Sequence, residues 1–256
     1  MLEETRLHRI QALLSTLNRV STEKIIQHLG VSRETVRRDI LKLEAAGALR
    51  RVHGGIVATT QEPELPLSIR NTVREKEKQA IARAAVQQLK AGQTLFIDSG
   101  STTSLLADEL LSMPGMTVIT NSLTVAQKLT ATESVAQHSV ILLGGYMGAS
   151  AQATSGDITV NELQRYRADV ALLSPVGVDA ASGASSFAHH EAAIARAMVQ
   201  HARTRIILAD HSKVGVTSRV VYATIPEIDI VVTDLTSADK PELSLLQTHC
   251  QQVIIV

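Results

Sequence analysis

Three arginines lie close together in the stretch VSRETVRRDILKLEAAGALRR, at positions 33, 37 and 38. If this stretch is helical, residues spaced by about one turn share one side of the helix, so the three guanidinium groups form one cationic face. A guanidinium group can donate two parallel hydrogen bonds to the edge of guanine or to a phosphate. The residue types and their spacing therefore indicate chemistry suited to the major groove of double-stranded DNA.

The residues around these arginines predict three helices that position them. Apolar residues recur at helical spacing in a first helix, Glu3–Leu17. Ser21 or Thr22 can cap a second helix, which Gly30 ends because glycine tolerates the left-handed backbone of a sharp turn. Ser32 can cap a third helix, which buries its apolar residues and presents the arginines outward. Two short helices joined by a tight turn are typical of a DNA-reading helix-turn-helix.

A basic hairpin is predicted directly after the third helix. Leu49–Ile56 has the pattern of a small wing whose bend is Gly54–Gly55, and its basic residues could reach phosphates or the minor groove. Three amphipathic helices can also form a plain bundle whose charges only face water, but the ordered series of turn glycine, serine cap, arginines and basic wing favours DNA binding. The residues expected to contact DNA are Ser32, Arg33, Glu34, Thr35, Arg37, Arg38, Arg50, Arg51 and His53.

Composition and charge exclude several other classes of protein. Residues 1–57 carry ten Lys and Arg against six Asp and Glu, a net charge of +4, and the remaining residues carry 15 against 19, which is −4. A basic head on an acidic body fits nucleic-acid binding by the head alone. Aromatic residues are 2% of the chain, which argues against single-strand binding by base stacking. The single cysteine, Cys250, excludes an internal disulfide and a Cys-rich zinc site.

The chain is predicted to have two domains and an α/β fold class. We expect a small N-terminal winged helix-turn-helix domain at residues 1–57, a linker at 58–74 that contains Pro63 and Pro66, and a larger α/β domain at 75–256 with a mostly parallel sheet. No secretory signal or membrane-length apolar run is found, so a cytoplasmic protein is expected. Strands are predicted at Thr94–Asp98, Thr117–Asn121, Ser139–Gly145, Asp169–Val178, Arg205–Asp210, Ile228–Asp234 and Gln252–Val256, and helices at Glu75–Leu89, Thr102–Leu111, Leu123–Thr130, Asp157–Tyr166 and Glu191–Ala202.

Polar residues and glycines follow most of these strands, at the edge where parallel sheets bind ligands. The first strand leads into Asp98-Ser-Gly-Ser-Thr-Thr103 at the start of a helix, where free backbone N–H groups and hydroxyls suit an anion. After the later strands, Lys213 could neutralise a phosphate or carboxylate, and Asp179 and Asp210 could accept from sugar hydroxyls. Each of these residues alone is more simply a helix cap or a solvated loop residue. Their shared position at the ends of several strands favours a common ligand site.

Other chemistry is less well supported by the sequence. His189, His190 and Glu191 are adjacent, so their side chains diverge on a helix and lack the spacing of a zincin metal site. The chain contains no nucleophile elbow, Walker loop or dinucleotide fingerprint. We therefore expect neither a metal nor a cofactor.

Taken together, the motifs resemble the DeoR family of bacterial transcriptional regulators over essentially the whole chain. The resemblance rests on Val31–Gly55 in the N-terminal part. In the rest of the chain it rests on FIDSGSTT (Phe96–Thr103), VITNS (Val118–Ser122), LLGG (Leu142–Gly145), GVD (Gly177–Asp179), HEAAIARAM (His190–Met198) and ADHSKVG (Ala209–Gly215).

The resemblance implies a sensor domain similar to ribose-5-phosphate isomerase, usually without enzymatic activity. It implies repression of a carbohydrate catabolic operon that is relieved by a phosphorylated sugar or related metabolite, and an oligomer of two or four chains. The chain departs from the family pattern at Ala195, where many relatives have lysine, and in the loop AASGASSFAHHE after Asp179, which points to an acidic or unusual sugar phosphate. The implied effector-binding residues are Asp98, Gly100, Ser101, Thr102, Thr103, Asn121, Gly145, Asp179, Glu191 and Lys213.

Two other functions stay open at this point. An active phosphosugar isomerase with a DNA-binding head requires a carboxylate base, for which Glu191 and Asp179 are the candidates. A transcriptional activator has the same sequence features as a repressor, and nothing in the residues separates these two roles.

Overall fold

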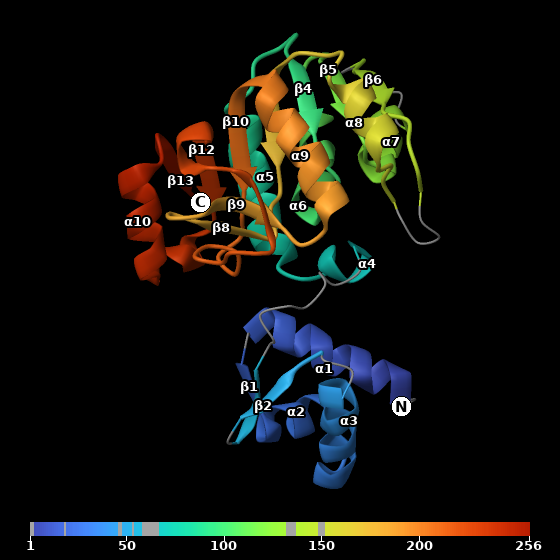
Figure 1. Cartoon of the computed structure of the whole chain (residues 1–256), viewed down its shortest axis with the longest axis vertical. Helices are drawn as coiled ribbons and strands as arrows, with labels where there is room; N and C mark the ends of the chain where they lie inside the picture. The colour runs from blue at the N-terminus through green and yellow to red at the C-terminus, as the bar shows by residue number, and fades with distance from the viewer. Residues whose placement is uncertain are drawn as a thin grey trace. The chain divides into compact units, whose positions relative to one another are not determined.

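The chain divides into two units, Met1–Ile69 and Arg70–Val256, in a computed structural model that describes residues 3–17, 19–45, 48–52, 54–57, 67–131, 137–147 and 152–256. Figure 1 shows the elements of each unit. His53, Pro63 and Pro66, which the sequence assigned to the wing and the linker, lie outside the described residues. The last part of the segment predicted as a linker contains a short helix, α4 (Leu67–Arg70).

The N-terminal unit contains the three predicted helices and the wing. A strand before the second helix pairs with the wing hairpin, so the wing belongs to a three-stranded antiparallel sheet of order β1-β3-β2. The elements are α1 (Glu3–Leu17), β1 (Arg19–Ser21), α2 (Thr22–Leu29), α3 (Arg33–Ala45), β2 (Arg50–Val52) and β3 (Gly55–Val57).

Local capping fixes where α2 and α3 begin and where α2 ends. The Ser21 hydroxyl accepts from the N–H of Lys24 at 3.2 Å, and the Ser32 hydroxyl accepts from the N–H of Thr35 at 3.2 Å. Gly30 ends α2 in the left-handed region, with φ at 63°. These contacts satisfy backbone groups that a helix end leaves without partners. The tight turn that presents α3 is therefore set by short-range chemistry.

A buried ion pair orients α3 against α1. Arg6 donates to both carboxylate oxygens of Asp39, at 2.7 Å and 3.1 Å, and the Asp39 side chain is 2% exposed. Buried Ile10, Val36 and Ile40 pack on the same inner side of the helices. Removing one partner of a buried ion pair typically costs about 3–5 kcal/mol because the other charge stays behind. The pair and the core thus hold the arginine-bearing face of α3 outward.

The C-terminal unit is built on a seven-stranded parallel sheet of order β13-β12-β10-β7-β4-β5-β6. Its strands are β4 (Thr94–Ile97), β5 (Thr117–Thr120), β6 (Ser139–Leu142), β7 (Ala168–Leu173), β10 (Ala202–Leu208), β12 (Ile230–Thr233) and β13 (Gln252–Ile255), and its helices are α5 (Glu75–Val86), α6 (Ser101–Leu110), α7 (Leu123–Thr130), α8 (Asp157–Leu163), α9 (His189–His201) and α10 (Pro241–His249).

Helices cover both faces of this sheet, as predicted. Alternate residues of a strand point to opposite faces. In β4, Leu95 and Ile97 pack with Ile81 of α5, whereas Phe96 packs with Met198 of α9. None of the described helices combines the length and the apolar character needed to cross a bilayer.

The order of the strands reverses between β4 and β7. From β4 the chain builds β5 and β6 on one side, then returns to the other side of β4 to build β7, β10, β12 and β13. The two connections leave the carboxyl ends of β4 and β7 in opposite directions. Open α/β sheets bind their ligands at such a point.

The prediction of one strand over Asp169–Val178 was wrong. β7 ends at Leu173, and the residues after Pro175 form β8 (Gly177–Asp179) in a separate antiparallel sheet of order β11-β9-β8, together with β9 (Gly183–Ser186) and β11 (Val220–Ala223). Pro175 has no N–H for a ladder, and Ser174 donates its N–H to Asp98 rather than to a strand. The sequence analysis missed β9, β11 and α10, and the residues of β9 (GASS) carry no apolar alternation that could have revealed that strand.

Candidate functional site

The arginines of α3 form an exposed face, as the DNA interface requires. The side chains of Arg33, Arg37 and Arg38 are 72%, 67% and 73% exposed. On β2, Arg50 and Arg51 are also exposed. Ser32 and Thr35 share a hydroxyl–hydroxyl hydrogen bond of 2.8 Å at the start of the helix. Apart from His53, every residue expected to contact DNA therefore lies on α3, on its cap or on the wing.

Carboxylates of the same unit pair with most of these arginines. Glu34 lies 3.3 Å from Arg37 and 3.7 Å from Arg38, Glu23 pairs with Arg33, and Glu44 pairs with Arg51. Exposed ion pairs contribute little to stability, so the arginines can exchange these partners for phosphates or bases. Sequence analysis did not single out Glu23 and Glu44, because their pairs join residues that are distant in the sequence.

At the carboxyl edge of the large sheet, Asp98 ties β4 to β7. Its carboxylate accepts from the N–H of Gly100 at 3.0 Å, the hydroxyl of Thr103 at 2.8 Å and the N–H of Ser174 at 2.6 Å. Burial raises the pKa of Asp98 to about 6, although these donors and the charge of Lys213 act in the opposite direction. Asp98 therefore organises this edge of the sheet, and its oxygens are already engaged by the protein.

Buried hydroxyl groups without partners surround this link. The side-chain oxygens of Ser101, Thr102 and Ser174 are buried and have no hydrogen-bond partner within the described part of the chain. Ser101 and Thr102 begin α6, where backbone N–H groups are also left over. A Cβ atom at Gly100 would lie 2.5 Å from the Cβ of Ser174, so only glycine allows the two loops to approach this closely. A buried helix start with unused donors is suited to an anion.

The neighbouring strands contribute one further unused polar atom. Asn121, after β5, donates to the carbonyl of Thr154 at 3.0 Å, and its own side-chain oxygen has no partner in the described residues. Gly145, after β6, has φ of 152°, and a Cβ there would lie 2.0 Å from the hydroxyl of Thr159. Packing against α8 thus explains this glycine, without any contact to a ligand.

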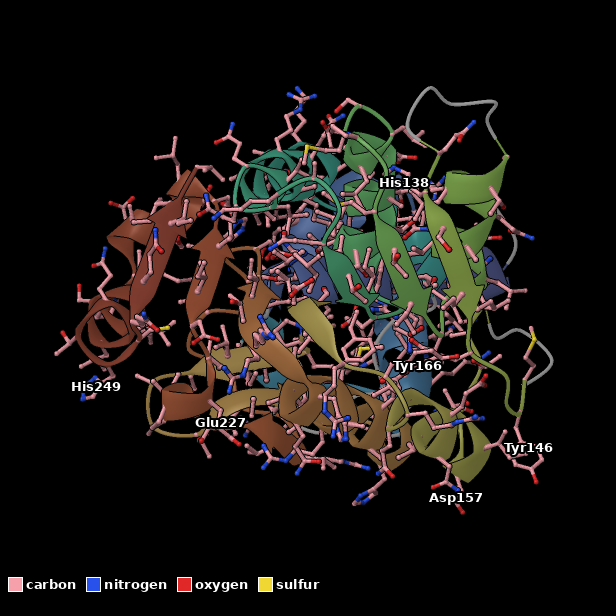
Figure 2. All side chains as sticks on the ribbon, turned by 90° about the horizontal axis from the view of Figure 1, so that it is seen from above. His138, Tyr146, Asp157, Tyr166, Glu227 and His249 are labelled. Carbon is pink, nitrogen blue, oxygen red and sulfur yellow. The ribbon has the colours of Figure 1, made fainter. Side chains whose placement is uncertain are left out.

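Gly156 packs against the ring of Tyr146, where an added Cβ would lie 2.7 Å from a ring carbon. Figure 2 shows Tyr146 and Asp157 at the same edge of the unit.

The other two predicted carboxylates lie on or beside the small antiparallel sheet. Asp179 accepts from the N–H groups of Ala181 and Ser182, both at 3.0 Å, and so holds its own hairpin. Glu191 is exposed at the start of α9 and accepts from the Ser186 hydroxyl at 3.0 Å. The sheet is joined to the loop after β10, because the backbone of β8 bonds to the backbone of residues 213 and 215.

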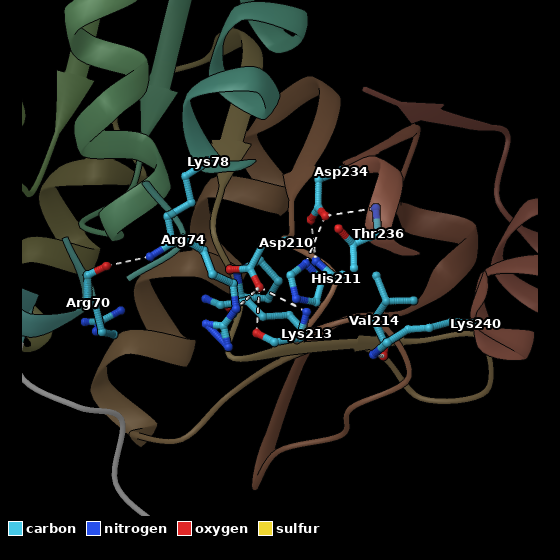
Figure 3. A network of polar contacts seen from close by, with 12 residues as sticks. Arg70, Arg74, Lys78, Asp210, His211, Lys213, Val214, Asp234, Thr236 and Lys240 are labelled. Atoms are coloured by element: carbon cyan, nitrogen blue, oxygen red, sulfur yellow. Dashed lines mark hydrogen bonds and ion pairs between the residues drawn. The ribbon is translucent and has the colours of Figure 1, made fainter. Parts of the chain in front are cut away.

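Lys213 belongs to a buried group that we call the cation cluster, shown in Figure 3: Arg70, Arg74, Lys78, Asp210 and Lys213. Arg74 lies 3.5 Å from Asp210, Lys78 donates to the carbonyl of Arg70 at 2.5 Å, and Lys213 donates to the carbonyl of Pro175. The cluster holds four basic groups and one carboxylate, and Arg74, Lys78 and Lys213 are largely buried. One oxygen of Asp210 has no hydrogen-bond partner in the described residues.

The excess of positive charge changes the acidity of the cluster. Burial lowers the pKa of Lys78 to about 8, with Lys213 as the next cause and Arg74 and Arg70 adding to it. Burial raises the pKa of Asp210, but Lys213 and Arg74 together bring it below its usual value. A bound anion would oppose the repulsion between the cations. Lys213 donates to the carbonyl of Pro175, and the N–H of the preceding Ser174 donates to Asp98, so the cluster and the unused hydroxyls near Asp98 belong to one region.

The sequence analysis missed Arg74 and Lys78. Arg74 was assigned to the linker and Lys78 to the helix predicted at Glu75–Leu89, and neither was named as a site residue. The available signal was the position of Lys78 three and four residues before Ile81 and Ala82, which places it on the buried face of α5. Asp210, expected to accept from sugar hydroxyls, instead pairs with Arg74 and accepts from the hydroxyl of Ser212 at 2.6 Å.

Comparison with known proteins identifies the family. A family model described as the DeoR C terminal sensor domain matches residues 73–235, and one described as the DeoR-like helix-turn-helix domain matches residues 6–62. The chain belongs to the DeoR family. The glycerol-3-phosphate regulon repressor of Escherichia coli (strain K12) is 31% identical to it over 247 residues, covering 96% of this chain and 95% of that protein. The transcriptional repressor GlcR of Bacillus subtilis (strain 168) is 36% identical over 236 residues, covering 91% and 89%. As a DeoR-family protein, the chain is a DNA-binding transcriptional regulator.

Among solved structures, ribose 5-phosphate isomerase A of Methanocaldococcus jannaschii matches 54% of this chain and 54% of that chain, with 17% identity and a TM-score of 0.40. A likeness of that size assigns neither a ligand nor an activity.

The arginines of α3 are expected to carry operator affinity. Arg37→Ala or Arg38→Ala should weaken operator binding by about 5- to 100-fold, the range of one or two lost guanidinium contacts, while the C-terminal unit stays folded. Gel-shift titration at fixed salt measures this. Arg83→Ala removes an exposed arginine of the C-terminal unit and serves as the control. Unchanged operator affinity in both α3 variants would refute the assignment.

Lys78 is expected to make stability rise with pH. Between about pH 8 and pH 10.5 the unfolded chain keeps a proton on Lys78 that the folded chain has lost, so the free energy of unfolding increases across this window. The full effect is roughly 3 kcal/mol. Urea unfolding from about pH 7.5 to about pH 9.5 should show a steeper rise for the natural chain than for Lys78→Met. Equal slopes would mean that folding does not lower the pKa of Lys78.

Proposed function

We propose that this chain represses a carbohydrate catabolic operon and leaves its operator when a phosphorylated sugar or a related metabolite binds the C-terminal unit. In this proposal residues 1–57 bind DNA, 58–74 connect the two parts and 75–256 sense the effector. The chain acts as a homodimer or homotetramer in the cytoplasm. A two-fold operator, with half-sites about one helical turn or a multiple apart, then matches the symmetry of paired DNA-binding units.

The observation that carries this proposal is the excess of buried positive charge at the point where the strand order reverses. Lys213 donates to the carbonyl of Pro175, and the N–H of the preceding Ser174 donates to Asp98, just before the start of α6. There the hydroxyls of Ser101 and Thr102 are buried without hydrogen-bond partners in the described residues, and Arg74 pairs with Asp210 in the same cluster as Lys213. A phosphate group offers negative charge to the cations and acceptor oxygens to the hydroxyls. The free oxygen of Asn121 can accept from a sugar hydroxyl. A phosphorylated sugar therefore matches this region twice: its phosphate suits the cations and hydroxyls, and its sugar hydroxyls suit Asn121.

The relatives support the same class of effector. One is named for the glycerol-3-phosphate regulon and is a repressor, and a second is also named as a repressor. By analogy, repression rather than activation is the role proposed for this chain. Glycerol 3-phosphate is accordingly the first probe to test.

The carboxylates of the region favour sensing over catalysis. A general base must reach a proton on the substrate. Asp98 already accepts three hydrogen bonds, Asp179 holds two backbone N–H groups, and Glu191 is exposed. We therefore propose that the chain has no isomerase activity. A coupled assay with ribose 5-phosphate, with Glu191→Gln for comparison, tests this point.

A thermal-shift screen tests the effector class. Phosphorylated sugars, glycerol 3-phosphate and sugar acids are compared with their uncharged counterparts, and at least one phosphorylated compound should raise the melting temperature. At 100 times its Kd, a ligand adds about 2.7 kcal/mol to the stability of the folded form. Lys213→Ala should abolish this shift and the release from DNA, because the ammonium group meets the phosphate.

Lys240→Ala is the matched control for that experiment. Like Lys213, Lys240 donates to a backbone carbonyl, in this case that of Val214 at 3.1 Å. Lys240 lies outside the cation cluster. It should respond to the ligand like the natural chain. A Lys213→Ala variant that shows an unaltered thermal shift and an unaltered release from the operator would contradict a phosphate-binding role.

A further inference from the structure

Arg74 has a backbone conformation that arginine rarely adopts. Its φ is 54° and its ψ is 42°, and it is the one non-glycine residue of the described chain with a positive φ. The left-handed region is unfavourable for such a residue because its Cβ approaches the following carbonyl oxygen. Strain of this kind persists only where surrounding contacts impose it, and it is concentrated at functional sites.

The contacts that impose it come from the cation cluster. The Arg74 side chain is 11% exposed and lies 3.5 Å from the carboxylate of Asp210, which is itself buried. Lys78, one turn further along α5, donates to the carbonyl of Arg70 at 2.5 Å. The N–H of Lys78 also donates to the carbonyl of Arg74 at 3.0 Å. Lys78 therefore contacts both ends of the turn at residues 70–74, and Asp210 holds the side chain of Arg74.

This turn is also where the polypeptide enters the C-terminal unit. Arg70 is the first residue of that unit, and the chain that precedes it belongs to the DNA-binding unit. A change of φ and ψ at Arg74 redirects the chain on its N-terminal side. The segment thus combines a strained residue, a charged contact to the candidate effector site and the covalent route between the two units.

We propose that Arg74 is a positioning residue that couples anion binding to DNA release: a bound phosphate competes with Asp210 for its guanidinium group, and Arg74 then leaves the left-handed backbone conformation. This inference rests on the proposed function, since the phosphate is that of the effector. A ligand shifts a conformational equilibrium only through different affinities for the two states. The dianion prefers the state in which Arg74 faces it, and relief of the strained turn favours the same state.

The experiment uses the full-length chain with Arg74→Gly, Arg74→Gln and, as the control, Arg83→Gln. Glycine adopts the left-handed turn without strain, so Arg74→Gly removes the guanidinium group and keeps the backbone. Arg83 is an exposed arginine of the same helix, paired with Glu109. Binding of inorganic phosphate and of glycerol 3-phosphate is measured by calorimetry. Operator affinity is measured by fluorescence anisotropy, without probe and with probe at saturation.

Saturating glycerol 3-phosphate should weaken operator binding of the natural chain and of Arg83→Gln by about tenfold or more, a usual size for coupling between sites. The two Arg74 variants should still bind the probe, about tenfold more weakly, and at saturation their operator affinity should fall by less than about twofold. Hydrogen exchange at residues 70–78 should increase in the natural chain on binding and stay unchanged in Arg74→Gly.

The outcomes separate the two proposals. If neither these probes nor any phosphorylated compound of the thermal-shift screen binds the natural chain, or if binding leaves operator affinity unchanged, the proposed function fails and this inference fails with it. If the natural chain responds and Arg74→Gly at saturation loses operator affinity to the same extent, the proposed function stands and the role of Arg74 is refuted. A melting temperature for each variant confirms that the chain is folded in every comparison.

Discussion

The structure depends most on one electrostatic constraint, the burial of Arg74, Lys78 and Lys213 around the carboxylate of Asp210. Moving charges out of water is costly unless opposite charges and hydrogen bonds compensate. Burial, and after it the charge of the neighbouring Lys213, lowers the pKa of Lys78 to about 8. The fold nevertheless brings these groups together at the reversal of strand order, where Asp98 fastens β4 to β7 and Gly100 lets the two loops touch. An anion bound here would oppose the repulsion between these cations.

The DNA-binding unit places its charges in the opposite environment. Its arginines are exposed, and their carboxylate partners, such as Glu34, lie in water, so exchanging them for phosphates costs little. Among the described residues of that unit, Arg6 and Asp39 form a buried ion pair that has a structural role. The chain thus has an exposed basic surface that is suited to DNA and a buried cation cluster that is suited to a small anion. A regulator requires that binding at one of these sites change the affinity of the other.

The sequence predicted the parts that short-range chemistry determines. Ser21, Gly30 and Ser32 set the helix ends, and the apolar strands gave the parallel sheet. The break at Pro175 was missed because Asp98, far away in the sequence, captures the N–H of Ser174. The small antiparallel sheet was missed because strands such as GASS lack an apolar pattern. Arg74 was assigned to the linker and Lys78 to a charged helix, and their contacts with Asp210 and Lys213 join residues that are far apart in the sequence. Tertiary contacts made by polar groups were therefore the part that local patterns did not contain.

The most direct test of the central claim is a measurement of anion affinity with and without DNA. Calorimetry with glycerol 3-phosphate is carried out on the free protein and on the protein saturated with operator. If the buried charge binds an anion that opposes DNA binding, the affinity must be lower in the complex, by the same factor by which the anion weakens the operator complex. Equal affinities in the two titrations would contradict the account, because the anion site and the DNA interface would then be independent.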